Sequence, residues 1–352
     1  MTRPTNATGG ERRWWGVMPI LAAPHMAGIA RQMEEVGFEG CFSLQIYGAP
    51  FVPMAATAAV TSRLKVATGV AIAGTRSPLE TAYAAMDVDR ISEGRFVLGL
   101  GSSIHSCVTG MYGEPKRKLL SHLRETVQVV RTIVANAHKG LDPISGEYFS
   151  AEFEEMMVTA PPVREHIPIW IAALQDKMTE LALEIGDGLM VHALWSADYT
   201  RAKQPFIDAA LTRHGRTRAD IEINAWPWIA INDEKSQAID DSRATVAAYS
   251  GYKEYEPFFE AIGFGDEARA CQLALGEHGD VAKVVSNVSD AMVQAFVACG
   301  SVDEVLERIE PFWDVVDSLC PMAPYRDLTM DQLTAYNAGL FRLVATARER
   351  AA

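Results

Sequence analysis

Short apolar runs alternate with amphipathic stretches along most of the chain. The runs have the composition of strands buried on both faces, and the stretches between them repeat apolar positions at helical spacing. This alternation predicts parallel strands, each followed by a helix that returns the chain to the same edge of the sheet. The expected strands are 14–18, 40–44, 64–72, 96–100, 167–172, 188–192, 221–231 and 315–322.

The helical stretches complete the same pattern. Gly37 follows the first of them, where a left-handed cap is usual. Eight strands without a break in composition predict a single (β/α)8 TIM barrel with insertions over residues 1–352, with 1–12 as a flexible N-terminus. The competing fold is an open doubly wound sheet, which typically has a glycine-rich turn directly after its first strand. Here the first glycine after that strand is Gly28. The expected helices are 24–36, 53–62, 78–91, 116–137, 177–185, 197–214, a broken helical region over 233–296, 302–312 and 328–346.

Two segments do not fit the regular repeat. Residues 139–162 are rich in Gly, Pro, Glu and aromatics, and a small hairpin is expected at 146–149. The second segment is about 249–285. Long non-repetitive segments on barrels often line the substrate pocket, so both are predicted to be insertions near the barrel mouth.

Composition excludes several classes of function. Lys plus Arg is 32 against 45 for Asp plus Glu, a net charge of −13, which argues against a nucleic-acid partner. The five cysteines are scattered without CxxC spacing, so neither a disulfide framework nor a zinc site is expected. The chain has no apolar run long enough to span a membrane and no signal-type N-terminus. These features predict a cytoplasmic protein without a nucleic-acid or membrane partner.

Candidate chemistry lies at the carboxyl ends of the predicted strands, where barrel enzymes keep their active sites. His105 follows the fourth strand, and an imidazole titrates near neutrality, as proton transfer requires. Gln45 after the second strand and His192 at the end of the sixth are the other catalytic candidates. The alternatives stay open: His105 as a polar surface group, His192 as a hydrogen-bonded core residue, and Gln45 as part of an ordinary loop.

The segment after the fifth strand is a candidate anion site. A short loop leads onto a helix, and the N–H groups and dipole of a helix N-terminus attract negative charge. Lys177 adds a positive charge there, whereas Asp176 offers the alternative of a simple helix cap. His and carboxylate residues at metal-ligand spacing are absent from the strand ends, so no metal is expected.

Four blocks of sequence, in this order, resemble the luciferase-like monooxygenases, and most closely actinobacterial proteins identified as coenzyme F420-dependent oxidoreductases. The likeness runs from about residue 16 to 322. The blocks are 61–70 (TSRLKVATGV) with 76–78 (RSP), 91–102 (ISEGRFVLGLGS), 169–173 (IWIAA) with 177–182 (KMTELA), and 186–188 (GDG).

The resemblance implies a cofactor site and a reaction. In relatives a non-proline cis peptide at the end of the third strand backs the cofactor ring, and it corresponds to Gly69–Val70 here. The implied reaction is hydride transfer between F420 and a small organic substrate, with the protein supplying position and electrostatics. The implied cofactor-binding positions are Gly69, Val70, Ala71, Ser102, Ser103, Ala172, Ala173, Leu174, Gln175 and Lys177.

Departures from the family pattern keep two other functions open. Many F420-dependent relatives have Asp-His where this chain has Leu44-Gln45, and sugar-phosphate dehydrogenases of the family have Glu near Ile104, so their acid and base assignments do not transfer. One alternative is a two-component monooxygenase that uses FMN and oxygen. The other is a non-catalytic barrel, because Gln175 stands where relatives commonly have Gly. Relatives usually pair through helical faces, which implies a homodimer. Arg76, Lys177 and Arg201 are the basic residues expected for the F420 tail.

Overall fold

The chain divides into two compact units. The computed structural model describes residues 5–46, 48–154, 158–278 and 281–351, with the backbone alone at 105, 106, 277 and 278. Unit 1 comprises Met1–Trp14, His192–Gln204 and Ala225–Ala352, and unit 2 comprises Trp15–Val191 and Pro205–Asn224.

Among the described residues, eight hydrogen-bonded strands form a closed ring. Pairing runs from β1 through β2, β3, β5, β8, β9, β10 and β13 and returns to β1. Trp15 lies opposite Gly40 in the parallel pair of β1 and β2, and Leu98 lies opposite Ile169 in that of β5 and β8. The predicted (β/α)8 barrel is confirmed. Its strands are β1 (Arg13–Val17), β2 (Gly40–Ser43), β3 (Lys65–Thr68), β5 (Phe96–Gly101), β8 (Ile169–Ala173), β9 (Gly188–Val191), β10 (Glu222–Ala225) and β13 (Ser318–Leu319).

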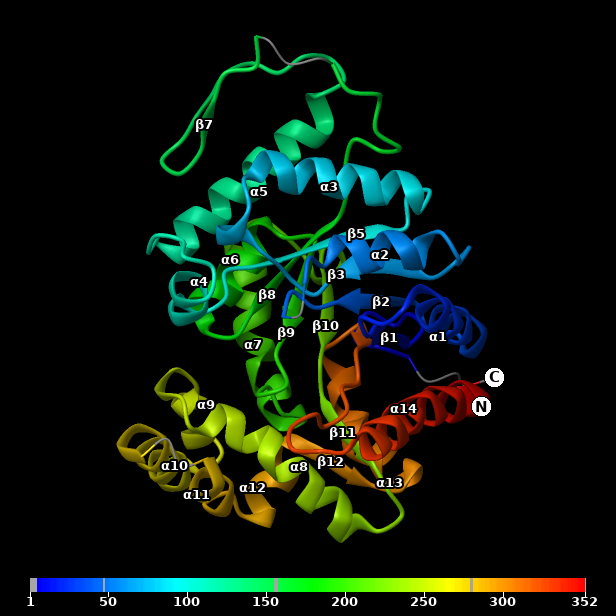
Figure 1. Cartoon of the computed structure of the whole chain (residues 1–352), viewed down its shortest axis with the longest axis vertical. Helices are drawn as coiled ribbons and strands as arrows, with labels where there is room; N and C mark the ends of the chain where they lie inside the picture. The colour runs from blue at the N-terminus through cyan, green and yellow to red at the C-terminus, as the bar shows by residue number, and fades with distance from the viewer. Residues whose placement is uncertain (1–4, 47, 155–157, 279–280, 352) are drawn as a thin grey trace. The chain divides into compact units, whose positions relative to one another are not determined.

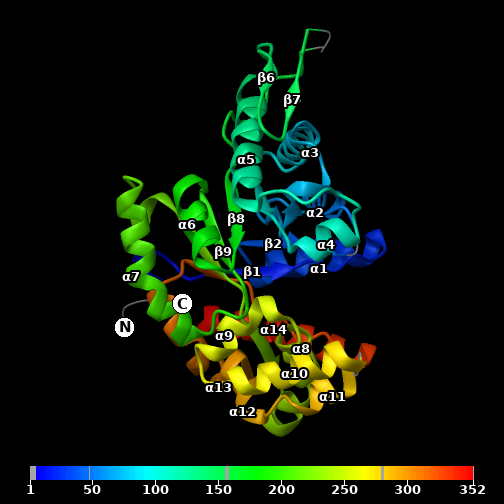
Figure 2. The ribbon, with the colours of Figure 1, turned by 90° about the vertical axis from the view of Figure 1, so that its left-hand side faces the viewer.

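The helices of unit 2 cover its strands. α3 packs against α2 and α5 (Figure 1). The small hairpin of β6 and β7 projects beyond α3 and α5 in both views (Figures 1 and 2). Ser77 caps α3 by accepting a hydrogen bond from the N–H of Glu80, which explains why this helix has its predicted bounds. These helices are α1 (Ala23–Val36), α2 (Phe51–Ala58), α3 (Pro78–Ile91), α4 (His105–Gly110), α5 (Leu119–Asn136) and α6 (Asp176–Ile185), and α7 (Ala197–Arg213) runs from unit 1 into unit 2.

Unit 1 contains a helical cluster and a two-stranded parallel sheet. α10 packs on α8, α9 and α11, and α12 packs on α8, as the yellow and orange ribbons of Figure 2 show. Its elements are β11 (Trp228–Ile231), α8 (Lys235–Ser250), α9 (Glu256–Glu260), α10 (Gly265–His278), α11 (Val281–Ser286), α12 (Asp290–Phe296), β12 (Val297–Gly300), α13 (Val302–Ile309) and α14 (Met330–Ala351). Short 3-10 turns occur at Ala73–Thr75, Arg218–Asp220, Lys253–Tyr255 and Glu310–Asp314.

The structure corrects the prediction of one long strand over 221–231. Residues on either side of Pro227 form separate strands, β10 in the barrel and β11 in the small sheet. Proline has no N–H to donate to a neighbouring strand, so a ladder is interrupted there. β11 pairs with β12, a strand that the apolar pattern did not separate from the helix before it.

Three further predictions differ in detail. The predicted strand 64–72 is divided at Gly69 and Val70 into β3 and the two-residue β4 (Ala71–Ile72). The last barrel strand is two residues long rather than eight, because only Ser318–Leu319 pair with β1. The expected hairpin is present as β6 (Ile144–Ser145) and β7 (Ser150–Ala151), with 146–149 as its connection.

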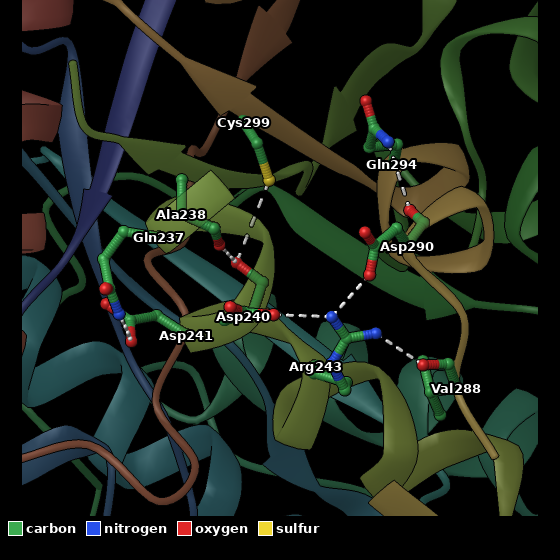
Figure 3. A network of polar contacts seen from close by, with 10 residues as sticks. Gln237, Ala238, Asp240, Asp241, Arg243, Val288, Asp290, Gln294 and Cys299 are labelled. Atoms are coloured by element: carbon green, nitrogen blue, oxygen red, sulfur yellow. Dashed lines mark hydrogen bonds and ion pairs between the residues drawn. The ribbon is translucent and has the colours of Figure 1, made fainter. Parts of the chain in front are cut away.

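An arginine joins α8 to the segment that begins α12 (Figure 3). Arg243 donates hydrogen bonds to the carboxylates of Asp240 at 2.6 Å and Asp290 at 2.5 Å, and to the carbonyl oxygen of Val288 at 2.6 Å. Its side chain is only 18% exposed. Beside it, the Ser242 hydroxyl donates to the carbonyl oxygen of Ala238 and approaches the Cys299 sulfur. This cluster fixes the packing of two helices and contains none of the predicted site residues.

Candidate active site at the carboxyl ends of the barrel strands

Bulky aromatic rings fill the barrel interior in unit 2, further from the carboxyl ends of the strands than the residues of the candidate site. The Trp15 ring centre lies 4.6 Å from that of Phe42 and 5.0 Å from that of Trp170. Glycines face these rings: a Cβ at Gly40 would collide with the Trp15 ring, and one at Gly188 with the Trp170 ring. The glycines therefore make room for an aromatic floor.

Toward the carboxyl ends of the strands, the inward positions become small. Side chains two residues apart on a strand point to the same face, so Ala172 follows Trp170 inward. A Cβ at Gly101 would lie 3.5 Å from the Cβ of Ala172 and 2.8 Å from the Cγ2 of Val70. The segment just before β4 and the ends of β5 and β8 thus meet around small side chains. We call Val70, Gly101 and Ala172 the cradle.

The peptide bond between Gly69 and Val70 is cis, as predicted. The Gln45 side chain anchors the segment that follows it. Its carboxamide oxygen accepts hydrogen bonds at 2.9 Å from the N–H of Ile72 and from Arg76, and its nitrogen donates to the Thr75 hydroxyl at 2.8 Å. Two donors converge on one atom, so that atom is the oxygen. The predicted residues Gln45 and Gly69–Ala71 are therefore brought together.

Ser102 and Ser103 follow β5 directly and are partly exposed. Ser103 has a φ of 55°, in the left-handed region that side-chain-bearing residues rarely adopt. Such conformations gather at functional sites, where the surrounding structure enforces them. The backbone of His105 begins α4, but its side chain lies outside the described residues, so its predicted catalytic role stays a prediction.

The predicted anion-binding segment lies at the end of β8. Ala173 ends the strand, Leu174 connects, and Gln175 is the N-cap residue of α6. Gln175, Asp176 and Lys177 are exposed, so this helix start is open to solvent. Asp176 lies in the first helical turn, where its charge favours the helix dipole and opposes an anion.

His192 belongs to unit 1 and lies against aromatic rings of the same unit. Its ring centre is 4.9 Å from that of Tyr249, 5.9 Å from that of Trp228 and 6.3 Å from that of Tyr255. Burial among these rings lowers the pKa of His192 to about 4. The imidazole is therefore neutral at pH 7. Its Nδ1 accepts a hydrogen bond from the N–H of Leu194 at 3.2 Å, which places the proton on Nε2.

A smaller and a larger cavity occur among the described residues, one in each unit. The smaller one, about 350 Å³, lies in unit 2 beside the start of α3 and includes Arg76, Arg117 and His122. The guanidinium of Arg117 lies 3.3 Å from Nε2 of His122, and burial, followed by this positive charge, lowers the pKa of His122. The larger one, about 860 Å³, lies in unit 1 and is lined by none of the predicted site residues.

The sequence did not single out several residues that build this site. Arg76 was considered only for the cofactor tail, yet it donates to Gln45 and stacks 5.5 Å from the Phe51 ring centre. Gly101 was noted only as part of the 91–102 block. Gly40 and Gly188 each stand on the strand that follows a strand with a tryptophan, and this was the available signal for the aromatic floor. Arg201 pairs with Asp198 and Asp314 in unit 1.

The closed ring of eight parallel strands with surrounding helices defines the (β/α)8 class of fold. The sequence pattern of the luciferase-like monooxygenases matches residues 7–316. The chain belongs to the luciferase-like monooxygenase family and is an oxidoreductase. None of the described helices is long and apolar enough to cross a membrane.

The proteins similar to this chain differ in cofactor: some are named for F420, and one was solved with FMN. A Mycobacterium tuberculosis protein with the provisional name coenzyme F420-dependent oxidoreductase is 30% identical over 254 residues, which cover 69% of this chain and 72% of that protein. The F420-dependent tetrahydromethanopterin reductase of Methanopyrus kandleri superimposes with a TM-score of 0.76 at 22% identity, covering 96% of this chain and 98% of its own. The FMN complex of the oxygenating constituent of 3,6-diketocamphane monooxygenase from Pseudomonas putida gives 0.66 at 18% identity, with the same coverage. Both solved structures have the same fold as this chain.

Proposed function

We propose that this protein transfers a hydride between coenzyme F420 and a small organic substrate. The observation that carries the proposal is the cradle, where the small residues Val70, Gly101 and Ala172 come together at the strand ends and would present no bulky side chain to a flat ring. When bound, the deazaflavin would supply or accept the hydride at its C5. F420 is preferred over FMN because relatives named for F420 include one at 30% identity.

The chain's own residues would hold the ring and the phosphate. Gly69, Val70 and Ala71 would back the ring, with Ser102 and Ser103 at its edge. Ala172, Ala173, Leu174, Gln175 and Lys177 would surround the phosphate at the start of α6, whose N–H groups and dipole favour an anion. Proton transfer would be assisted by His105 or by the Nε2–H of neutral His192.

Gln45 would act as a positioning residue. Its carboxamide does not titrate, and its oxygen already accepts hydrogen bonds from Ile72 and Arg76. These bonds hold the segment after Val70 against the end of β2. A substrate or cofactor bound on that segment would therefore depend on Gln45 for its position, while the proton would come from another group.

The test is a side-by-side titration of the purified protein with oxidised F420 and with FMN, followed by quenching of each cofactor's fluorescence. We expect micromolar binding of F420, with FMN at least about tenfold weaker, a difference of about 1.4 kcal/mol. Tight FMN with weak F420 would instead support the monooxygenase function. Binding of neither would support the non-catalytic barrel, and recovery of binding in Gln175→Gly would then assign the loss to the bulk of that side chain.

A matched pair of variants tests the cradle itself. Gly101→Ala places a methyl group 2.8 Å from Cγ2 of Val70, so Val70 must shift, and this would disturb the ring that it is proposed to back. F420 affinity should fall about tenfold or more, equivalent to about 1.4 kcal/mol. Gly28→Ala adds the same methyl group on α1 with no atom within 4 Å and should leave binding unchanged. Equal affinities in the two variants would contradict the proposed ring position.

A further inference from the structure

Three segments that include the carboxyl ends of barrel strands carry no charged side chain. Asp, Glu, Lys and Arg are absent from 14–30, 41–62 and 96–113, although these residues make up 22% of the chain. The segments contain all but the first residue of β1 and of β2, the whole of β5, and the loops that follow these strands. Charge is found instead after β4, at Arg76, and at the start of α6, at Asp176 and Lys177.

These uncharged loops lie side by side in unit 2. A Cβ at Gly48 would lie 3.7 Å from Cδ1 of Ile20, so the loops after β1 and β2 touch. The Tyr112 hydroxyl donates a hydrogen bond to the carbonyl oxygen of Gln45 at 3.4 Å, which joins the segment after β5 to the loop after β2. The three loops therefore form one surface next to the segment that Gln45 anchors.

Large apolar side chains are exposed on this surface. Ile20, Leu21, Ile46, Met111 and Tyr112 are between 37% and 71% exposed. We call these five residues the apolar rim. Clustered exposed apolar side chains mark binding surfaces more often than isolated ones do. Their position beside the proposed cofactor cradle points to a small-molecule ligand that approaches the ring from this side.

We propose that the apolar rim selects an uncharged, apolar substrate and excludes anionic ones; this rests on the proposed function, because the cradle defines where the substrate reacts. An apolar chain that covers the rim gains affinity by burying its methylenes, about fourfold for each. A carboxylate or phosphate in the same place would lose hydration without meeting a cation from the uncharged loops. Thus the charged loops after β4 and β8 would serve the cofactor, and the uncharged loops would serve the substrate.

Binding of straight-chain methyl ketones from 2-butanone to 2-nonanone tests the proposal, measured by saturation-transfer NMR with and without F420. We expect the dissociation constant to fall about threefold to fourfold per methylene until the rim is covered. The matched anion 4-oxopentanoate, close in size to 2-hexanone, should bind at least about tenfold more weakly, corresponding to about 1.4 kcal/mol. A flat series, or equal binding of the anion, would overturn the proposal.

Rim variants locate the effect. Ile46→Lys and Met111→Lys alter exposed side chains and should flatten the chain-length dependence without changing F420 affinity or the melting temperature. Val163→Lys, at an exposed valine that precedes β8, is the matched control and should keep the dependence. Rim variants that change the oligomeric state but not ketone affinity would overturn the proposal and assign the rim to contact between copies. Chain-length dependence without F420 binding would support the rim and overturn the proposed cofactor.

Discussion

At the residue scale, the structure defines both the tautomer and the charge of His192. The N–H of Leu194 donates to Nδ1, and the rings of Trp228, Tyr249 and Tyr255 lie against the imidazole. Burial lowers its pKa to about 4, so the folded protein binds a proton there less readily than the unfolded chain does. The contribution of His192 to stability is therefore fully present above about pH 6.5 and is lost as the pH falls through about 4.

We expect NMR titration of the His192 ring to give a midpoint near pH 4. In His192→Asn the side-chain oxygen can still accept a hydrogen bond from the N–H of Leu194, but the amide does not titrate. The free energy of unfolding should then vary less steeply between pH 4 and 6.5 than it does in the wild type. A midpoint near 6.5, with identical pH slopes for the two proteins, would contradict this assignment.

The sequence predicted where His192 stands but not what surrounds it. Its position after a strand followed from the apolar pattern alone. Its aromatic neighbours come from β11, α8 and a 3-10 turn, more than thirty residues further along the chain, and no periodicity connects them to it. Gln45 shows the same limit, since the N–H of Ile72 and the guanidinium of Arg76 reach it only after β2 and β4 have been placed.

At the scale of elements, Arg243 tests how α8 is fixed to α12. Arg243→Met retains the length of the side chain but leaves Asp240, Asp290 and the carbonyl of Val288 without their donor (Figure 3). Loss of these charge-assisted bonds at a mostly buried side chain should lower the free energy of unfolding by about 1–3 kcal/mol. Urea denaturation followed by circular dichroism measures the change.

Arg269→Met is the matched control for this prediction. Arg269 also bridges two carboxylates, those of Glu256 and Asp266, but its side chain is 47% exposed. Water and salt screen such pairs, so this substitution should leave the free energy of unfolding nearly unchanged. Equal losses in the two variants would show that burial does not set the strength of the Arg243 cluster.

Elements with strong local signals were predicted with nearly their observed bounds. α3 begins at Pro78 after the Ser77 cap. α1 ends before Gly37, which has a φ of 92°, in the left-handed region that favours glycine. β12 was missed because Val297–Gly300 continues directly from the apolar face of α12. Its identity as a strand depends on pairing with β11, a partner more than sixty residues away, and pattern alone carries no such information.

At the scale of the whole molecule, the boundaries of the two units fall within strands, within α7 or at the end of β9 rather than in long linkers. The division at Trp14 and Trp15 lies inside β1, and that at Asn224 and Ala225 lies inside β10. Domains that unfold separately are usually joined by exposed linkers that few contacts cross. We therefore expect residues 1–352 to unfold as the single domain that the sequence predicts.

Hydrogen exchange combined with the Arg243→Met variant tests this expectation. Arg243 lies in unit 1, whereas the amides of β5, such as those of Leu98 and Leu100, lie in unit 2. If unfolding is cooperative, the slowest amides of β5 and of β12 exchange only through global unfolding. The variant must then lower the free energy of exchange by the same amount in both strands. If the units unfold independently, β12 loses protection and β5 retains its wild-type value. That second result would overturn the single-domain prediction, and calorimetry would then resolve two transitions in place of one.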